Sequence, residues 1–227
     1  SGDNSITLGQ FNEASGVLSV AIGSQLSSSA QSSTAFGYGT TASGVNSTAL
    51  GYFTNATGDY STTFGVLSQA QGNTSAAMGY GTIASDYGSL VIGVNNLIGS
   101  TLTSANNFNP SNTAFVIGNG ADEANRSDAL SVLFDGTTTI AGDLSINSDA
   151  RLKANIISLG STLAKLLQID GKTYTMKKDE NKKQKIGVLA QDIEKVFPEL
   201  VSESNGVKSV NYQGLVPVLI NALKEQD

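Results

Sequence analysis

Two residues of the sequence, Ser148 and Lys153, could together supply a nucleophile and a base. The 227 residues include no Cys and no His, which excludes disulfides, thiolate zinc sites and Cys–His or Ser–His pairs, so a serine nucleophile needs a lysine as its base. A serine and a lysine five positions apart do not share a helical face, so the pair requires a bent or extended segment. Burial or the nearby Arg151 would have to lower the pKa of Lys153 toward neutrality. Alternatively, Ser148 or Asp149 caps a helix while Lys153 remains solvated.

The charged residues divide the chain into unlike parts. Residues 1–121 contain four acidic side chains and no Lys or Arg, residues 122–147 have a net charge of −4, and residues 148–227 carry twelve basic and ten acidic side chains. The overall net charge of −6 argues against a general nucleic-acid binder. The composition therefore predicts a boundary near residue 148.

The weakly charged part is built from a repeat of fourteen residues. Each copy has a serine, a glycine four positions later and a large apolar residue just before that glycine. The serines are Ser5, Ser19, Ser33, Ser47, Ser61, Ser75 and Ser89, and the glycines are Gly9, Gly23, Gly37, Gly51, Gly65, Gly79 and Gly93. The large apolar residues are Leu8, Ile22, Phe36, Leu50, Phe64, Met78 and Ile92. A second glycine follows half a period later, replaced by Ala30 and Asp86 in two copies. Alternation of period two predicts two short strands per copy, each followed by a tight glycine corner. Strands spaced this evenly predict a solenoid with one coil per repeat.

Each predicted strand has one small side and one large apolar side. If the small residues point inward, the large ones form a continuous exposed stripe, which suits a cyclic homo-oligomer in which equivalent stripes cover one another. The alternative places the large residues inside and the small ones outside. A coil of fourteen residues has little internal room for a phenylalanine, which favours the first arrangement.

The segment NSTALGYFTNATG and the other six copies of the repeat, over about residues 5–93, resemble the YadA-like head repeat of trimeric autotransporter adhesins. The resemblance implies a left-handed parallel β-roll that trimerises side by side. It also implies a glycan or cell-surface receptor as partner. Ser28 and Asp86 depart from the usual Ala and Gly of the pattern.

Tyr38, Tyr52 and Tyr80 occupy one column of the repeat, together with Gln10, Ser24 and Val66. Exposed tyrosines in a row could form an aromatic ladder for glycan contact. Stacking between successive coils of one chain explains the same column, and we favour it. The Thr-rich columns lack the regular Thr-x-Thr ladder of an ice-binding face.

The repeat ends after Gly93, and residues 94–147 are predicted to form a loop and a β-rich neck. Residues 95–112 are rich in Asn and Ser and predict a loop. Strands are expected at 113–118, 129–135 and 137–146, with Asp135-Gly136 as the hairpin turn between the last two.

Residues 148–227 have the composition of an ordinary α+β domain. We expect a helix from the leucines of 159–167, strands at 172–176 and 186–189, a turn at 177–183, a short helix at 191–196 and a hairpin around Asn205-Gly206. A last helix carries one apolar face, which could join symmetry mates in a bundle, at Leu215, Val218, Leu219, Ala222 and Leu223.

Three motifs of this domain, SDARLKANI, IGVLAQDIEKVFPELV and VNYQGLVPVLINAL, resemble the intramolecular chaperone auto-processing domain of phage endosialidase tailspikes. That family guides trimer assembly of the preceding fibre and then cuts itself off through a Ser/Lys dyad. The resemblance implies Ser148 as the nucleophile, Lys153 as the base and Asn147–Ser148 as the scissile bond. Asp149 and Arg151 belong to the same motif and are expected to orient the dyad.

The sequence therefore predicts a mainly β chain with a C-terminal α+β domain, divided into a head (1–93), a neck (94–147) and a chaperone domain (148–227). We expect a homotrimeric surface fibre or adhesin, extracellular or on a virion, without cofactor, metal site, nucleic-acid partner or membrane span. The alternative is primarily a self-cleaving Ser/Lys autopeptidase of a phage tail fibre. No basic segment followed by an apolar stretch is present, so no signal peptide is expected within these residues.

Overall fold

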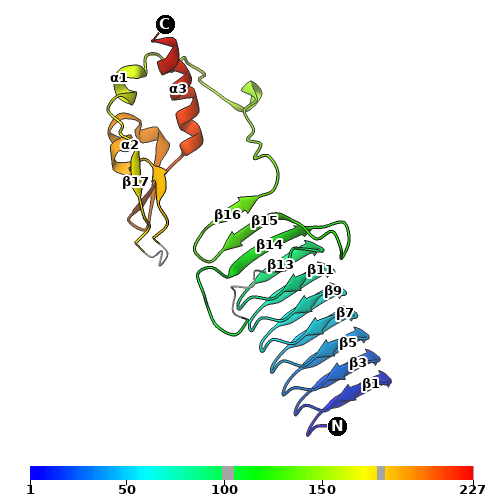
Figure 1. Cartoon of the computed structure of the whole chain (residues 1–227). Helices are drawn as coiled ribbons and strands as arrows, with labels where there is room; N and C mark the ends of the chain where they lie inside the picture. The colour runs from blue at the N-terminus through cyan, green and yellow to red at the C-terminus, as the bar shows by residue number, and fades with distance from the viewer. Residues whose placement is uncertain (99–104, 178–181, 227) are drawn as a thin grey trace. The chain divides into compact units, whose positions relative to one another are not determined.

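The computed structural model describes residues 1–98, 105–177 and 182–226, and the chain forms two compact units (Figure 1). The first unit spans Ser1–Ile146 and the second Asn147–Asp227. In its described residues the first unit contains strands and no helix, whereas the second mixes short helices and hairpins, so the predicted fold class is confirmed. Among the described residues, no helix is long and apolar enough to cross a membrane.

The first unit is a roll of stacked coils, each with one five-residue strand and, in all but the last described coil, one two-residue strand (Figure 1). In the described residues, the long strands pair in parallel as β1 (Ile6–Gln10), β3 (Val20–Ser24), β5 (Thr34–Tyr38), β7 (Thr48–Tyr52), β9 (Thr62–Val66), β11 (Ala76–Tyr80) and β13 (Leu90–Val94). The short strands form a second parallel sheet from β2 (Glu13–Ala14), β4 (Ser27–Ser28), β6 (Thr41–Ala42), β8 (Asn55–Ala56), β10 (Gln69–Ala70) and β12 (Ile83–Ala84). Successive coils pair fourteen residues apart, as in Leu50 opposite Phe64, so the sequence repeat sets the register.

The interior of the roll is filled by small residues. Ala35, Ala49 and Ala77 of the long strands and Ala42 and Ala56 of the short ones are fully buried. The large apolar residues of the long strands point outward, because side chains alternate between the two faces of a strand and the small side faces in. The arrangement that we favoured from the sequence, with small residues inside, is therefore confirmed.

The half-period glycines, such as Gly44, begin the turn after the short strand, as predicted, whereas the glycines of the long strands let the coils approach closely and do not form corners. Gly51 lies inside β7 with φ of 130°, and a Cβ atom added there would lie 1.9 Å from the carbonyl oxygen of Gly65 in the next coil. The backbone turns at Phe53, two residues later, where φ is 49°. For the glycine of the long strand the prediction of a corner was therefore wrong by two residues, because the positive φ and the close backbone contact, and not a turn, require a residue without a side chain there.

The sheet of long strands continues beyond the last repeat. β14 (Thr113–Asn119) pairs in parallel with β13, with Gly118 opposite Gly93, and β15 (Asp128–Leu133) and β16 (Thr138–Ile140) follow antiparallel. Asp135-Gly136 turns between β15 and β16, as predicted. The third neck strand is shorter than the expected 137–146, because Gly142 and Asp143 favour irregular structure over a strand.

The second sheet ends on a side chain instead of another strand. The Asn96 Oδ1 atom accepts a hydrogen bond from the Ile83 N–H at 2.7 Å, and its Nδ2 atom donates to the Ile83 carbonyl at 2.9 Å. Arg126 then donates to the carbonyls of Gly81 and Asn96. These bonds satisfy backbone groups that a further coil would otherwise pair. The expected loop at 95–112 is irregular where described, and its residues 99–104 lie outside the described part.

The second unit contains η1 (Ala150–Leu152), α1 (Leu163–Leu166), β17 (Lys172–Tyr174), β18 (Lys185–Gly187), α2 (Ala190–Val196), η2 (Pro198–Leu200), β19 (Val201–Ser204), β20 (Val207–Val210), η3 (Tyr212–Gly214) and α3 (Leu215–Lys224). Its core is formed by Ile193, Phe197 and Val218 from α2 and α3. The hairpin at Asn205-Gly206 and the last two helices are where the sequence predicted them.

Two predictions for this unit need correction. The leucine helix of 159–167 is reduced to the single turn α1, because Gly160 adopts a left-handed φ of 70° and interrupts it. The strand expected at 172–176 stops at Tyr174, and the one expected at 186–189 is β18, shifted toward the N-terminus. Of the expected turn at 177–183, residues 178–181 lie outside the described part.

Candidate functional site

Ser148 and Lys153 are brought together by one turn of 3₁₀ helix. The turn η1 occupies the residues between them, and the Lys153 Nζ atom donates a hydrogen bond of 2.7 Å to the Ser148 Oγ atom. A regular α-helix would place the two side chains on different faces, whereas here Asp149 and Lys153, at the two ends of the turn, have extended backbones that permit the contact. The sequence-based requirement for a bent segment is met.

Asp149 and Arg151 shape this turn. Asp149 is the N-cap of η1, and its Oδ1 atom accepts a hydrogen bond from the Arg151 backbone N–H at 2.9 Å. The Arg151 guanidinium also donates to both carboxylate oxygens, at 3.1, 3.1 and 2.6 Å. The side-chain bonds from Arg151 hold the pKa of the Asp149 carboxyl below its ordinary value, and the same pairing raises the pKa of Arg151. Arg151 is therefore engaged by Asp149, and both alternatives drawn from the sequence, the cap and the Ser–Lys pair, are present together.

In the single chain this group of residues faces solvent. Asn147, Ser148 and Lys153 are all exposed. A lysine can take a proton from a serine hydroxyl only in its neutral form, and burial is the usual means by which a protein favours that form. The geometry thus joins the Lys153 and Ser148 side chains by a hydrogen bond, and in the single chain both are exposed.

Glu225 is an organising residue of the second unit that sequence reasoning did not find. Its carboxylate, at the end of α3, accepts hydrogen bonds from the Ser161 hydroxyl and from the backbone N–H groups of Thr162 and Leu163 at the start of α1. The bond from Ser161, followed by those from the backbone, holds the pKa of the Glu225 carboxyl below its ordinary value. More than sixty residues separate the partners, so no local spacing signals the contact.

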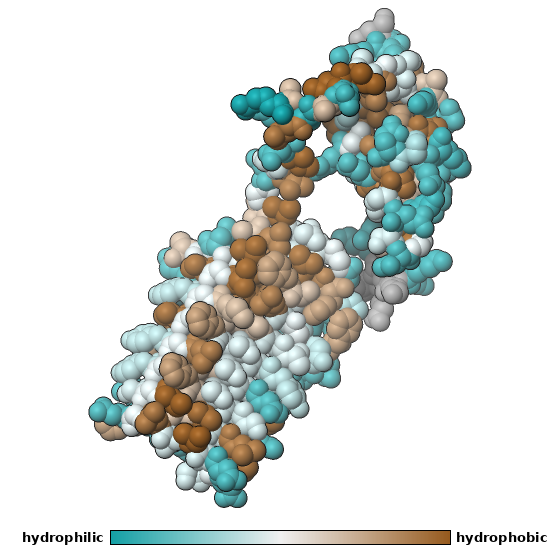
Figure 2. All heavy atoms as spheres, turned by 180° about the vertical axis from the view of Figure 1, so that it is seen from behind, coloured by the Kyte–Doolittle hydropathy of each residue, from teal (hydrophilic) through white to brown (hydrophobic). Residues whose placement is uncertain are grey.

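The outer face of the long-strand sheet carries a row of exposed apolar side chains. Figure 2 shows a band of hydrophobic surface along the stacked coils. Phe36 and Phe64 are 52% and 59% exposed, although they are aromatic. The other exposed members of the row are Ile6, Leu8 and Met78. We refer to Ile6, Leu8, Ile22, Phe36, Leu50, Phe64, Met78 and Ile92 as the outer stripe.

The tyrosine column is partly stacked. The rings of Tyr38 and Tyr52 lie 5.4 Å apart at an interplanar angle of 13°, and Phe53 packs edge-on against both. The predicted stacking between coils is therefore confirmed for these two tyrosines. Tyr80 has Val66 and Val94 as its strand neighbours, so the aromatic ladder is not continuous.

The fold and the site define a class of protein: a repetitive β-roll of fibre type, followed by a separate α+β unit that begins with a hydrogen-bonded Ser–Lys pair. Residues 1–25, 28–54, 42–68, 56–82 and 70–96 match the family model described as YadA head domain repeat (2 copies). Residues 148–202 match the model described as Chaperone of endosialidase. The chain thus combines YadA head repeats with a chaperone-of-endosialidase domain. The motif VNYQGLVPVLINAL lies beyond the matched residues.

Two curated relatives are long tail fibre proteins. The long tail fiber protein Gp37 of Escherichia phage AR1 is 30% identical over 100 residues, covering 40% of this chain and 9% of that protein. The Gp37 protein of Salmonella phage S16 is 35% identical over 83 residues, covering 32% of this chain and 11% of that protein. The matched stretch therefore spans about a tenth of each relative. No solved structure matches the chain.

Proposed function

We propose that this chain is a segment of a homotrimeric fibre, located on a phage tail or a bacterial surface. In this proposal the YadA-type roll forms the fibre or adhesive part, and the C-terminal domain assists the folding of the trimer. Both curated relatives carry names of phage tail fibres, which favours the phage tail as the location. A glycan or cell-surface receptor is the expected partner of the assembled fibre.

The observation that carries the proposal is the outer stripe. Soluble monomers rarely expose contiguous apolar patches larger than a few hundred Å². The roll has no internal space for these side chains, because alanine and serine already fill it. Rotational symmetry about an axis parallel to the roll would place equivalent stripes against one another along their whole length.

The C-terminal domain is proposed to act before the fibre is complete. It forms a compact unit with its own core, separate from the roll, as a detachable folding aid would require. Parallel sheets built from many similar coils can pair out of register while they fold. A domain that brings three chains together at one end would set the register for all of them.

Self-cleavage at Asn147–Ser148 is the proposed second step. A neutral Lys153 accepts the hydroxyl proton of Ser148, and the Oγ atom attacks the carbonyl carbon of Asn147. The peptide C–N bond breaks as Lys153 returns the proton to the amino group of Ser148, which leaves an ester. Water then hydrolyses the ester to a carboxylate on Asn147 and a free hydroxyl on Ser148. Because Lys153 is exposed in the single chain, we expect this step only where assembly covers it.

Sedimentation equilibrium of the full chain tests the fibre proposal. A mass of three chains is expected, and a monomer across all concentrations would overturn the proposal. Intact mass spectrometry over prolonged incubation tests cleavage separately, with the fragment of residues 148–227 as the expected product. The Ser148→Ala variant should stay uncut while still forming trimers. Cutting at the same bond in that variant would exclude the Ser148 mechanism.

The second candidate function is that of a self-cleaving autopeptidase, in which cutting is the main activity. The hydrogen bond of 2.7 Å between Lys153 and Ser148 favours it. Complete cleavage by a monomeric sample would support this candidate over the fibre proposal, because cleavage would then need no assembly.

A further inference from the structure

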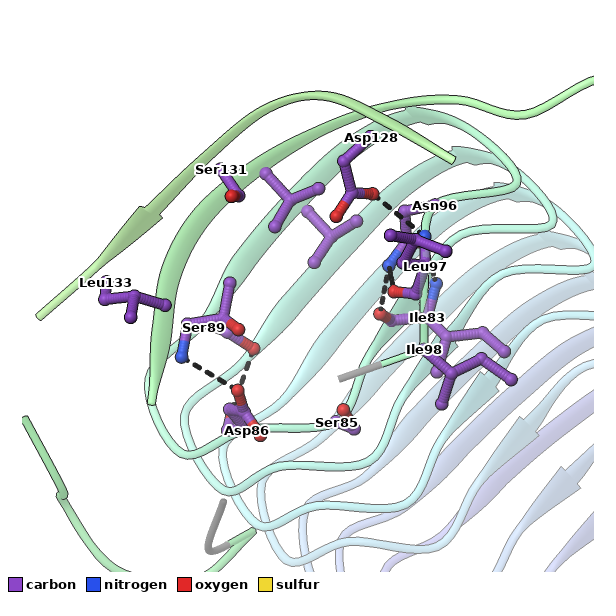
Figure 3. Close-up of a pocket in the computed structure, with 13 residues that line it drawn as sticks. Ile83, Ser85, Asp86, Ser89, Asn96, Leu97, Ile98, Asp128, Ser131 and Leu133 are labelled. Atoms are coloured by element: carbon purple, nitrogen blue, oxygen red, sulfur yellow. Dashed lines mark hydrogen bonds between the residues drawn. The ribbon is translucent and has the colours of Figure 1, made fainter. Parts of the chain in front are cut away.

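A cavity of about 310 Å³ lies in the first unit, where the last coil meets β14 and β15 (Figure 3). A water molecule takes about 30 Å³ in the liquid, so the cavity has room for a small organic molecule. Six of its thirteen lining residues are apolar: Ile83, Val91, Leu97, Ile98, Val116 and Leu133. The remainder are polar or acidic, so the cavity has both an apolar wall and polar groups.

Asp86 places a carboxylate in this cavity at a position where the repeat normally has a glycine. Four other coils carry Gly16, Gly44, Gly58 and Gly72 there. The Asp86 side chain is only 1% exposed. Its Oδ2 atom accepts a hydrogen bond from the Thr113 N–H at 2.8 Å, but its Oδ1 atom has no hydrogen-bond partner among the described residues. A buried carboxylate oxygen without a donor is unfavourable, so the site lacks one hydrogen-bond donor.

A second carboxylate lines another side of the cavity. Asp128 accepts a hydrogen bond from the Leu97 N–H at 2.8 Å, and Figure 3 shows its side chain well apart from that of Asp86. Partial burial raises the pKa of the Asp128 carboxyl. No Lys or Arg is among the thirteen lining residues. The lining therefore holds two acidic groups and no basic one, and the nearby Arg126 guanidinium donates to the carbonyls of Gly81 and Asn96.

We propose that this cavity binds a small organic ammonium ion with an aliphatic body. The ammonium group carries three N–H donors, of which one would reach the free Oδ1 atom of Asp86 and the others the hydroxyls of Ser85 and Ser89 that line the same wall. The aliphatic body would cover the apolar wall formed by Val91 and Val116. This proposal goes beyond the fibre function and does not depend on it.

The lining chemistry favours an organic cation over a metal ion. Calcium takes six to eight oxygen ligands and magnesium keeps several waters, so both prefer polar surroundings. The described residues contain no group of three or more His, Cys, Asp or Glu side chains that could hold a metal. Nearly half of the lining is aliphatic, which suits hydrocarbon and not a hydration shell.

Isothermal titration calorimetry of the full chain with n-butylammonium chloride tests the proposal. Saturable binding of one n-butylammonium per chain is expected, with no binding of the neutral n-butanol. Asp86→Asn keeps an oxygen that can accept from the Thr113 N–H but removes the charge, and it should weaken binding by about tenfold or more. The matched control Asp143→Asn removes an exposed carboxylate outside the cavity and should leave the affinity unchanged.

The titration of the Asp128 carboxyl carbon, followed by nuclear magnetic resonance, adds a second measurement. It would not respond to n-butylammonium if Asp86 had only a structural role. Saturating n-butylammonium should lower the titration midpoint of Asp128, because a nearby cation favours the charged carboxylate. If Asp86→Asn fails to fold by circular dichroism, Asp128→Asn carries the test, and weaker binding is again expected. Absence of saturable binding to the natural sequence would overturn the proposal. So would unchanged affinity in the folded cavity variants, or tighter binding of calcium chloride than of n-butylammonium.

Discussion

Replacing Phe64 tests whether the outer stripe is an interface between chains. Phe64 lies in β9, with Leu50 and Met78 beside it in the neighbouring strands, and its side chain is 59% exposed. Phe64→Ser removes an aromatic ring that the single roll does not bury. We therefore expect the roll to stay folded while its assembly becomes weaker.

The magnitude follows from the exposed area. A phenylalanine buries 150–250 Å² when fully covered, so about 120 Å² of Phe64 remains available for an interface. At about 25 cal/mol per Å², covering this area stabilises the assembly by about 3 kcal/mol per chain. For three chains the sum is about 9 kcal/mol, or roughly six orders of magnitude in the dissociation constant, as an upper estimate.

Sedimentation equilibrium over a range of concentrations measures this effect. The matched control is Tyr60→Ser, because Tyr60 is 62% exposed but lies at a corner of the coil, outside the outer stripe. Circular dichroism should show an unchanged roll for both variants. A Phe64→Ser trimer as stable as that of the natural sequence would refute the reasoning, as would equal weakening by Tyr60→Ser.

Three further predictions concern the coil, the cleavage site and the C-terminal domain. Gly51→Ala should destabilise the roll by about 3 kcal/mol or more, because the added Cβ lies 1.9 Å from a carbonyl oxygen of the next coil and φ is 130°. In urea unfolding followed by circular dichroism, Gly142→Ala should have no comparable effect, since no atom of the described residues lies within 4 Å of its Cβ position. Lys153→Met should abolish the appearance of the fragment 148–227 in intact mass spectra, whereas Lys224→Met should leave it unchanged, and persistent cutting in Lys153→Met would exclude the lysine as base. The hydrogen bonds to Glu225 lower the pKa of its carboxyl in the folded state below the ordinary 4.5, so their stabilisation is present at neutral pH and is lost as the pH falls below about 4.5. Urea unfolding from neutral pH to about pH 3 should show this loss, and Glu225→Gln should remove that part of the pH dependence; an identical profile in the variant would contradict the assignment.

The roll was the most predictable part of the molecule. A strict fourteen-residue period requires each coil to repeat the backbone of the one before, so strand positions and register follow directly, as for Leu50 opposite Phe64. The corners were less predictable. A regular spacing of glycines can mean either a left-handed turn or a close approach of two backbones. The sequence does not show which of these two reasons applies at Gly51.

The C-terminal unit was predictable where local signals are strong. Asn205-Gly206 marks its hairpin, and the apolar period of α3 marks its last helix. The length of the helix expected at 159–167 was overestimated, because the spacing of its leucines predicts a helix but does not show that Gly160 adopts a left-handed φ. Its short remainder α1 depends on Glu225 for its first N–H groups, which is a contact between distant parts of the chain.

By itself the sequence determined the coil period, the change of composition near residue 148 and the requirement that a serine nucleophile use a lysine as its base. Those conclusions depend on residue type and spacing, which are local properties. Only the tertiary structure decided that the small residues fill the roll, that a 3₁₀ turn joins Lys153 to Ser148, and that one carboxylate oxygen of Asp86 has no hydrogen-bond partner among the described residues. The physical reason is that burial and hydrogen bonding depend on which groups meet in space, and a repeat pattern does not specify the contacts at the positions where it is broken.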